Sequence, residues 1–145
     1  MGYAIFAQRK LALQGLINSI QLKQTQRSDE QNMLAKKSLS LQNDITNLNY
    51  LESSTLAPLY KQLISAGTDA ERTSVQAQIK SIETDFENSV NAIQMQQYPI
   101  EQKENTIEME VKRLDTELTS LQKLLEKIEE AEKDGVDKAM PSFTA

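Results

Sequence analysis

The chain has 145 residues, the length of one modest domain, and it contains no cysteine, histidine or tryptophan. These absences exclude Cys/His zinc sites, disulfides, thiol chemistry and acid/base catalysis by histidine. Aromatic residues make up 5% of the chain and the net charge is −5, while four glycines and three prolines supply few of the turns that a β-sandwich or barrel requires. Gln, Asn, Ser and Thr together number 45, too many for a thick globular core, yet 17 Leu and 11 Ile are too many for a disordered chain. A long, thin, all-α protein fits both facts.

The first twenty residues, MGYAIFAQRKLALQGLINSI, are mildly apolar but do not form a targeting segment. Arg9 and Lys10 follow the first apolar patch, whereas a signal peptide places basic residues before a continuous apolar region. Phe6 stands where a myristoylation motif requires Ser or Thr. No stretch reaches the roughly 20 apolar residues that span a bilayer. We therefore expect no cleaved signal and no transmembrane segment. We favour a location outside the cell or at the cell surface. A cytoplasmic location and an amphipathic helix on a membrane surface are the alternatives.

The first half of the chain carries a heptad repeat, in which positions a to g recur every seven residues and apolar a and d residues form the seam between paired helices. It predicts a helical arm over about residues 3–66. From about Leu51 the repeat slips, and Pro58 is expected to begin a fresh helical segment with Ser54 or Thr55 near its cap. The d positions before the slip are Phe6, Leu13, Ile20, Arg27, Leu34, Leu41 and Leu48.

The strongest turn signal lies at the middle of the chain, in the sequence Ala66-Gly67-Thr68-Asp69-Ala70-Glu71. Gly67 suits a left-handed helix terminus, and Thr68 followed three residues later by Glu71 is a capping box. We therefore expect a turn at residues 67–69.

The second half predicts an arm over about residues 70–134, followed by a C-terminal tail, 135–145. Pro99 lies inside this arm, but the heptad phase is the same on both sides, so we expect one kinked helix, with a true break as the alternative. Gly135 is expected to end the arm. Its d positions are Ile79, Phe86, Ile93, Ile100, Ile107, Leu114, Leu121 and Ile128.

The charges of the two arms favour pairing within one chain. Residues 1–66 carry net +3 and residues 67–145 carry net −8, so an antiparallel hairpin brings opposite charges together. With a turn near residue 68, Gln31 faces the neighbourhood of Glu104 and Arg27 lies near Glu108, which aligns the polar interruptions of the two repeats. The expected fold is a single long antiparallel two-helix coiled-coil hairpin. Its predicted seam is Leu13, Ile20, Leu34, Leu41, Ile107, Leu114, Leu121 and Ile128.

A lone hairpin leaves many apolar side chains outside its seam. Leu11, Leu22, Leu39, Met95 and Met109 take outer heptad positions, which is more apolar surface than a narrow hairpin leaves in water without a second contact. Further apolar residues flank the seam (Leu16, Val75, Ile82 and Leu124) or lie near the chain ends (Tyr3, Ile5, Phe6, Val136, Met140 and Phe143). The terminal residues either cap the hairpin locally or dock into a neighbour. We predict association with copies of the same chain, through Phe6, Leu11, Leu22, Leu39 and Phe143.

No motif for catalysis, cofactor binding or metal binding is present in the sequence. The acidic run Glu126, Glu129, Glu130 and Glu132 lacks the Gly and Asp pattern of a calcium loop, and no phosphate-binding or nucleophile motif occurs. The acidic net charge opposes binding to nucleic acid. We expect a protein that is not an enzyme and has no cofactor, no metal and no nucleic-acid partner.

Segments such as MGYAIFAQRKLALQGLINSI and VKRLDTELTSLQKLLEKIEE, in a chain rich in Gln, Asn, Ser and Thr, resemble the axial proteins of bacterial flagella and type III secretion systems. The resemblance covers the whole chain and implies a non-enzymatic structural subunit that self-assembles into a filament or tube. The chain is also similar to the cytosolic coiled-coil stalk of these export machines. That likeness implies the alternative function of an adaptor, stalk or export chaperone, with secretion-system proteins as partners.

Overall fold

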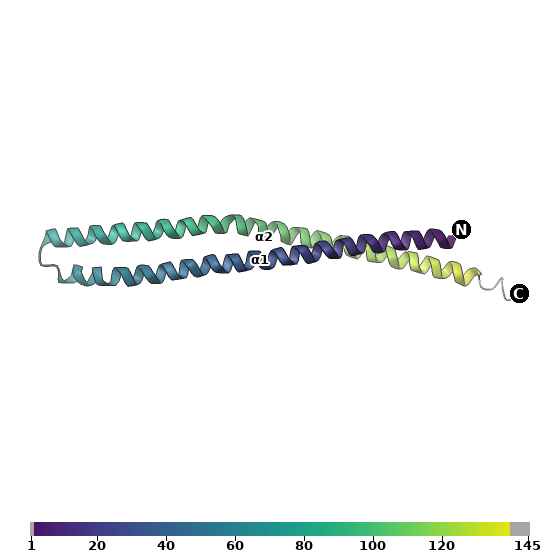
Figure 1. The fold of residues 1–145 in the computed structure, drawn as a ribbon, viewed down its shortest axis with the longest axis horizontal. Helices are drawn as coiled ribbons and strands as arrows, with labels where there is room; N and C mark the ends of the chain where they lie inside the picture. The colour runs from purple at the N-terminus through teal and green to yellow at the C-terminus, as the bar shows by residue number, and fades with distance from the viewer. Residues whose placement is uncertain (1, 140–145) are drawn as a thin grey trace. The chain divides into compact units, whose positions relative to one another are not determined.

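A computed structural model describes the backbone of residues 2–139 and the side chains of residues 4–135. The described chain consists of two α-helices, α1 (Gly2–Ser65) and α2 (Asp69–Ala139), joined by a three-residue connection. They run in opposite directions and pack against each other, with no strand among the described residues (Figure 1). The predicted all-α helical hairpin is confirmed.

The contacts divide the hairpin into two compact units, where the sequence predicts one domain. Unit 1 combines Met1–Gln31 with Asn105–Ala145, and unit 2 is the continuous segment Asn32–Glu104. In each unit, a segment of α1 lies beside a segment of α2 (Figure 1).

The core of each unit is a single row of aliphatic side chains, with no buried polar or charged residue among those described. Unit 1 buries Ile17, Ile20, Ile107 and Leu114, and unit 2 buries Leu41, Ile45, Leu56, Ile79 and Ile100. All lie at a or d positions or at the shifted positions that follow the slip. Because two helices share only one seam, burial of these residues provides most of the hydrophobic stabilisation.

The predicted slip of the repeat is present in α1, but the predicted new helix at Pro58 is wrong. Leu56 is buried and Leu59 is half-buried, as a shifted phase requires, while α1 continues without interruption through Pro58. The Ser54 and Thr55 hydroxyls do not cap a new helix. They donate to carbonyls one turn earlier in the same helix, at 3.0 and 2.7 Å. Packing of the seam on both sides of Pro58 holds the helix together despite the missing N–H.

The second arm is also one helix, because α2 passes through Pro99 without a break. Ile100, directly after the proline, is buried at a d position, so the seam continues across it. The helix also passes through Gly135 to Ala139, five residues beyond the expected end at residue 134. Glycine is a poor helix former but does not forbid a helix. Gly135 does not adopt the left-handed conformation that commonly ends a helix, so α2 continues through it.

The turn is organised by the start of α2. The Glu71 N–H donates to Thr68 Oγ1 at 3.2 Å, as the predicted capping box requires. Glu71 Oε2 accepts the Gly67 N–H at 3.0 Å, one residue before the Thr68 N–H that the motif expects. The expected left-handed conformation of Gly67 is wrong, because no described glycine has a positive φ. The last turn of α1 instead tightens through an N–H···O bond from Ala66 to Leu63, so the chain reverses without a left-handed residue.

Candidate interaction surfaces

Polar contacts across the seam join the two helices of unit 1. Lys10 Nζ lies 3.8 Å from Glu129 Oε1 and 3.7 Å from Glu132 Oε2. Gln24 Nε2 donates a hydrogen bond to Asp115 Oδ1 at 2.8 Å. These side chains are partly exposed, so each pair contributes only tenths of a kcal/mol. Their main effect is to favour one register of α1 against α2.

Arg27 occupies a d position of the seam and pairs with an acidic residue of α2, two residues beyond the predicted Glu108. Its Nε atom is buried and lies 2.9 Å from Glu110 Oε2, although the N–H direction makes this an ion pair without a well-formed hydrogen bond. Its Nη1 donates to Glu30 at 2.7 Å. Glu110, and then Glu30, raise the pKa of the Arg27 guanidinium above its ordinary value.

In unit 2, Tyr60 links the helices near the turn. Its hydroxyl donates to Glu83 Oε1 at 3.0 Å. The hydrogen bond to Glu83, then the charge of Glu83, slight desolvation and the charge of Glu52, raise the pKa of Tyr60 above 10.0, because each disfavours the phenolate.

The residues predicted for the seam all lie in partly or fully covered positions. Ile20, Leu41, Ile107 and Leu114 are buried, and Leu114 is the most enclosed at 1% exposure. The rest of the predicted seam is half-buried: Leu13, Leu34, Leu121 and Ile128. Unit 1 and unit 2 each hold their own part of this set.

The residues predicted for subunit contacts fall into three groups. Leu11, Leu22 and Leu39 are strongly exposed, at 76%, 60% and 62%. Phe6 is half-buried at a d position, which leaves less of its ring available to a neighbour. Phe143 lies outside the described residues.

Several exposed apolar residues were not among those predicted from the sequence. Within the same heptad frame, Met33 takes position c and Tyr50 position f of α1. Tyr98 takes position b of α2. The same frame could have identified them. Among the described residues, fourteen large hydrophobic side chains are exposed and nine are buried. The exposed set is Ile5, Leu11, Leu16, Leu22, Met33, Leu39, Tyr50, Leu51, Tyr60, Ile64, Met95, Tyr98, Met109 and Leu124.

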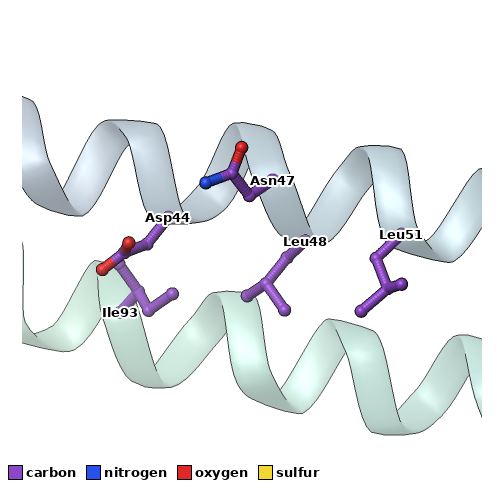
Figure 2. A pocket seen from close by; sticks show the side chains of 5 residues that line it. All are labelled: Asp44, Asn47, Leu48, Leu51 and Ile93. Carbon is purple, nitrogen blue, oxygen red and sulfur yellow. The ribbon is translucent and has the colours of Figure 1, made fainter.

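An open groove of about 330 Å³ lies beside the seam of unit 2. Leu48 and Leu51 extend from α1 toward α2 and line it together with Ile93, Asp44 and Asn47 (Figure 2). The groove lies where the heptad phase of α1 slips, which leaves Leu51 between two seam positions and 53% exposed. It can receive an apolar side chain but is too open to enclose a small molecule.

A second groove in unit 2 is polar and carries the carboxylates of Glu52, Glu83 and Glu87. No group of three acidic, His or Cys side chains in the described part of the chain is arranged to hold a metal ion. The acidic run of α2 faces another open depression, in which Lys133 accompanies Glu126, Glu129 and Glu130.

Within residues 2–139, neither helix contains an apolar stretch long enough to cross a bilayer. Comparison of the chain with protein-family models, with curated proteins and with solved structures finds no match.

Proposed function

We propose that this protein is a non-enzymatic structural subunit whose helical hairpin self-assembles into a filament or tubular assembly. The supporting observation is the excess of exposed over buried large hydrophobic side chains in the described chain. Single exposed leucines are ordinary on soluble proteins, but here the exposed set recurs along both helices. Covering these side chains with copies of the same chain removes them from water without any other component.

The charge pattern is consistent with this role. Two of the four basic residues of α1 in unit 1, Lys10 and Arg27, contact acidic residues of α2 at the seam. Their charges are therefore partly neutralised within each hairpin, which lowers the repulsion between neighbouring hairpins.

Light scattering coupled to size-exclusion chromatography, followed by electron microscopy of the purified full chain, tests the proposal. We expect concentration-dependent assembly of the wild-type protein into elongated particles. Replacing Leu11, Leu22 and Leu39 together by Ser should give a soluble, helical protein that no longer assembles. Lys123→Ser, on an exposed and charged position of α2, is the control and should assemble like the wild type.

A second candidate is an adaptor, stalk or export chaperone of a secretion apparatus, which uses the hairpin as a docking rod. The apolar groove at Leu48, Leu51 and Ile93 favours it, because a partner can insert a single side chain there without covering the rest of the hairpin. A wild-type protein that stays monomeric up to millimolar concentration would contradict self-assembly and leave the adaptor as the better explanation.

A further inference from the structure

The outer heptad positions b, c and f of unit 1 differ sharply in charge between the two helices. On α1 we define the α1 outer face by Ala4, Ile5, Gln8, Leu11, Ala12, Gly15, Asn18, Ser19, Leu22, Thr25, Gln26 and Asp29. All twelve are exposed, and only Asp29 is charged.

The equivalent positions on α2 form the α2 outer face, which carries eight charged side chains among fourteen exposed positions. It consists of Asn105, Thr106, Met109, Lys112, Arg113, Thr116, Thr119, Ser120, Lys123, Glu126, Lys127, Glu130, Lys133 and Asp134. Charged outer positions are the ordinary solution for a coiled coil in water. The α2 outer face follows this rule, and the α1 outer face departs from it.

A face without charge loses its water at a lower cost than a charged face does, which favours its use as a packing surface. Ile5, Leu11 and Leu22 gain free energy on burial, whereas burying charged groups requires each to find a partner. The Thr25 hydroxyl already donates to the Gln21 carbonyl at 3.1 Å, so its donor needs no new partner at an interface.

The charge pattern also selects the occupant. If the α2 outer face of another copy packed on the α1 outer face, its charged side chains would lose water and find only Asp29 to pair with. The α1 outer face of another copy brings no such cost. Of the four cations of α1 in unit 1, Lys10 and Arg27 are directed to acidic residues of α2, and Arg9 and Lys23 take g positions, which lie outside the α1 outer face.

The spacing of the two leucines fits a two-fold arrangement. Leu11 and Leu22 are eleven residues apart, about three helical turns or ~16.5 Å, so they lie on nearly the same side of α1. When two α1 segments run antiparallel about an axis midway between these residues, Leu11 of one copy meets Leu22 of the other at both ends of the contact. Gly15, Asn18 and Ser19 then lie near the axis, where no large side chain separates the helices.

We propose that the α1 outer face of unit 1 binds the same face of a second copy in an antiparallel, two-fold contact. This inference rests on the proposed self-assembly and assigns one of its interfaces. At a rise of 1.5 Å per residue, the face is about 39 Å long, and with a helix width of about 10 Å it buries roughly 400 Å² per copy. The total of about 800 Å² is below the roughly 1,200–2,000 Å² of stable specific interfaces, so the contact is weak, reversible and dependent on concentration.

The substitution Gly15→Glu tests the face without weakening the hairpin. The position is exposed, a Cβ there meets no atom within 4 Å, and Glu favours a helix more than Gly does. Circular dichroism should show unchanged helix content. Sedimentation velocity from micromolar to millimolar concentration should show association of the wild type and loss of this step in the variant. Thr116→Glu, at the same heptad position on the α2 outer face, is the matched control and should associate normally.

Cysteine cross-linking tests the direction of the contact, because the chain has no cysteine of its own. Under oxidising conditions, a mixture of Leu11→Cys and Leu22→Cys proteins should form mainly the mixed disulfide dimer. Preferential cross-linking of each variant with itself would indicate parallel helices and overturn the proposed arrangement.

The remaining outcomes separate this inference from the proposed function. If the wild type and both Glu variants assemble equally well, self-assembly stands and this interface is wrong. If the wild type stays monomeric throughout, both fail. Binding of the monomer to neutral lipid vesicles, abolished by Gly15→Glu, would identify a lipid surface as the occupant and also overturn the proposal.

Discussion

At the scale of single residues, stability depends on a few fully covered aliphatic side chains, and Leu114 is the most enclosed of them at 1% exposure. Leu114→Ala should lower the free energy of unfolding by about 2–5 kcal/mol, because the substitution removes buried methyl groups and leaves space that two helices cannot easily close. Urea denaturation followed by circular dichroism measures this loss. Met109→Ala, on an exposed position of the same helix, should change stability by less than about 0.5 kcal/mol. Equal effects of the two substitutions would contradict the assigned seam.

Tyr60 makes the stability of unit 2 sensitive to alkaline pH. Its folded pKa lies above the ordinary 10.0 because of the hydrogen bond to Glu83, so the stabilisation is complete below pH 10.0 and is lost as the pH rises through the folded pKa. Glu52 and Glu83 are the charged groups that raise it. Tyr60→Phe should lower stability at neutral pH and reduce the alkaline loss. Urea midpoints at neutral and strongly alkaline pH measure the difference, and Tyr98→Phe serves as the control. An unchanged alkaline slope in Tyr60→Phe would show that the bond does not contribute.

At the scale of the helices, both prolines are tolerated because the seam on either side holds the backbone in place. Pro99 is exposed and supplies no N–H to the Met95 carbonyl. Pro99→Ala should therefore raise the free energy of unfolding, by up to about 3 kcal/mol. Pro58→Ala should act in the same direction, while Gln96→Ala, on a nearby exposed position, should have little effect. Chemical denaturation checks these values, and a destabilised Pro99→Ala would mean that the proline shapes the packing around it.

The heptad pattern was sufficient to predict two long helices and their seam, since apolar periodicity is a strong signal when it persists over many turns. The structure differs from the predictions at three residues: no new helix begins at Pro58, Gly67 is not left-handed, and α2 does not end at Gly135. Pro58 costs about 3 kcal/mol within a helix, and packing of the seam on both sides outweighs this cost. Gly67 and Gly135 permit a left-handed helix terminus but do not require one, so they are weak signals. The partner of Arg27 was missed by two residues, because the connection alone does not fix the register. The α1 outer face could be predicted from the sequence by asking which outer heptad positions lack charged residues, as well as which positions are apolar.

At the scale of the whole molecule, self-association and folding are coupled. Only the folded hairpin presents the α1 outer face as a continuous surface, so association stabilises the folded state, by about 2.7 kcal/mol at a hundredfold excess of protein over the dissociation constant. The melting temperature should therefore rise with protein concentration in the wild type. It should rise equally in Thr116→Glu and rise less in Gly15→Glu, which loses one of the interfaces. Circular dichroism melts across a wide concentration range measure this dependence. A constant melting temperature in all three proteins would show that folding is complete in one chain, and the exposed leucines of α1 would then need another explanation.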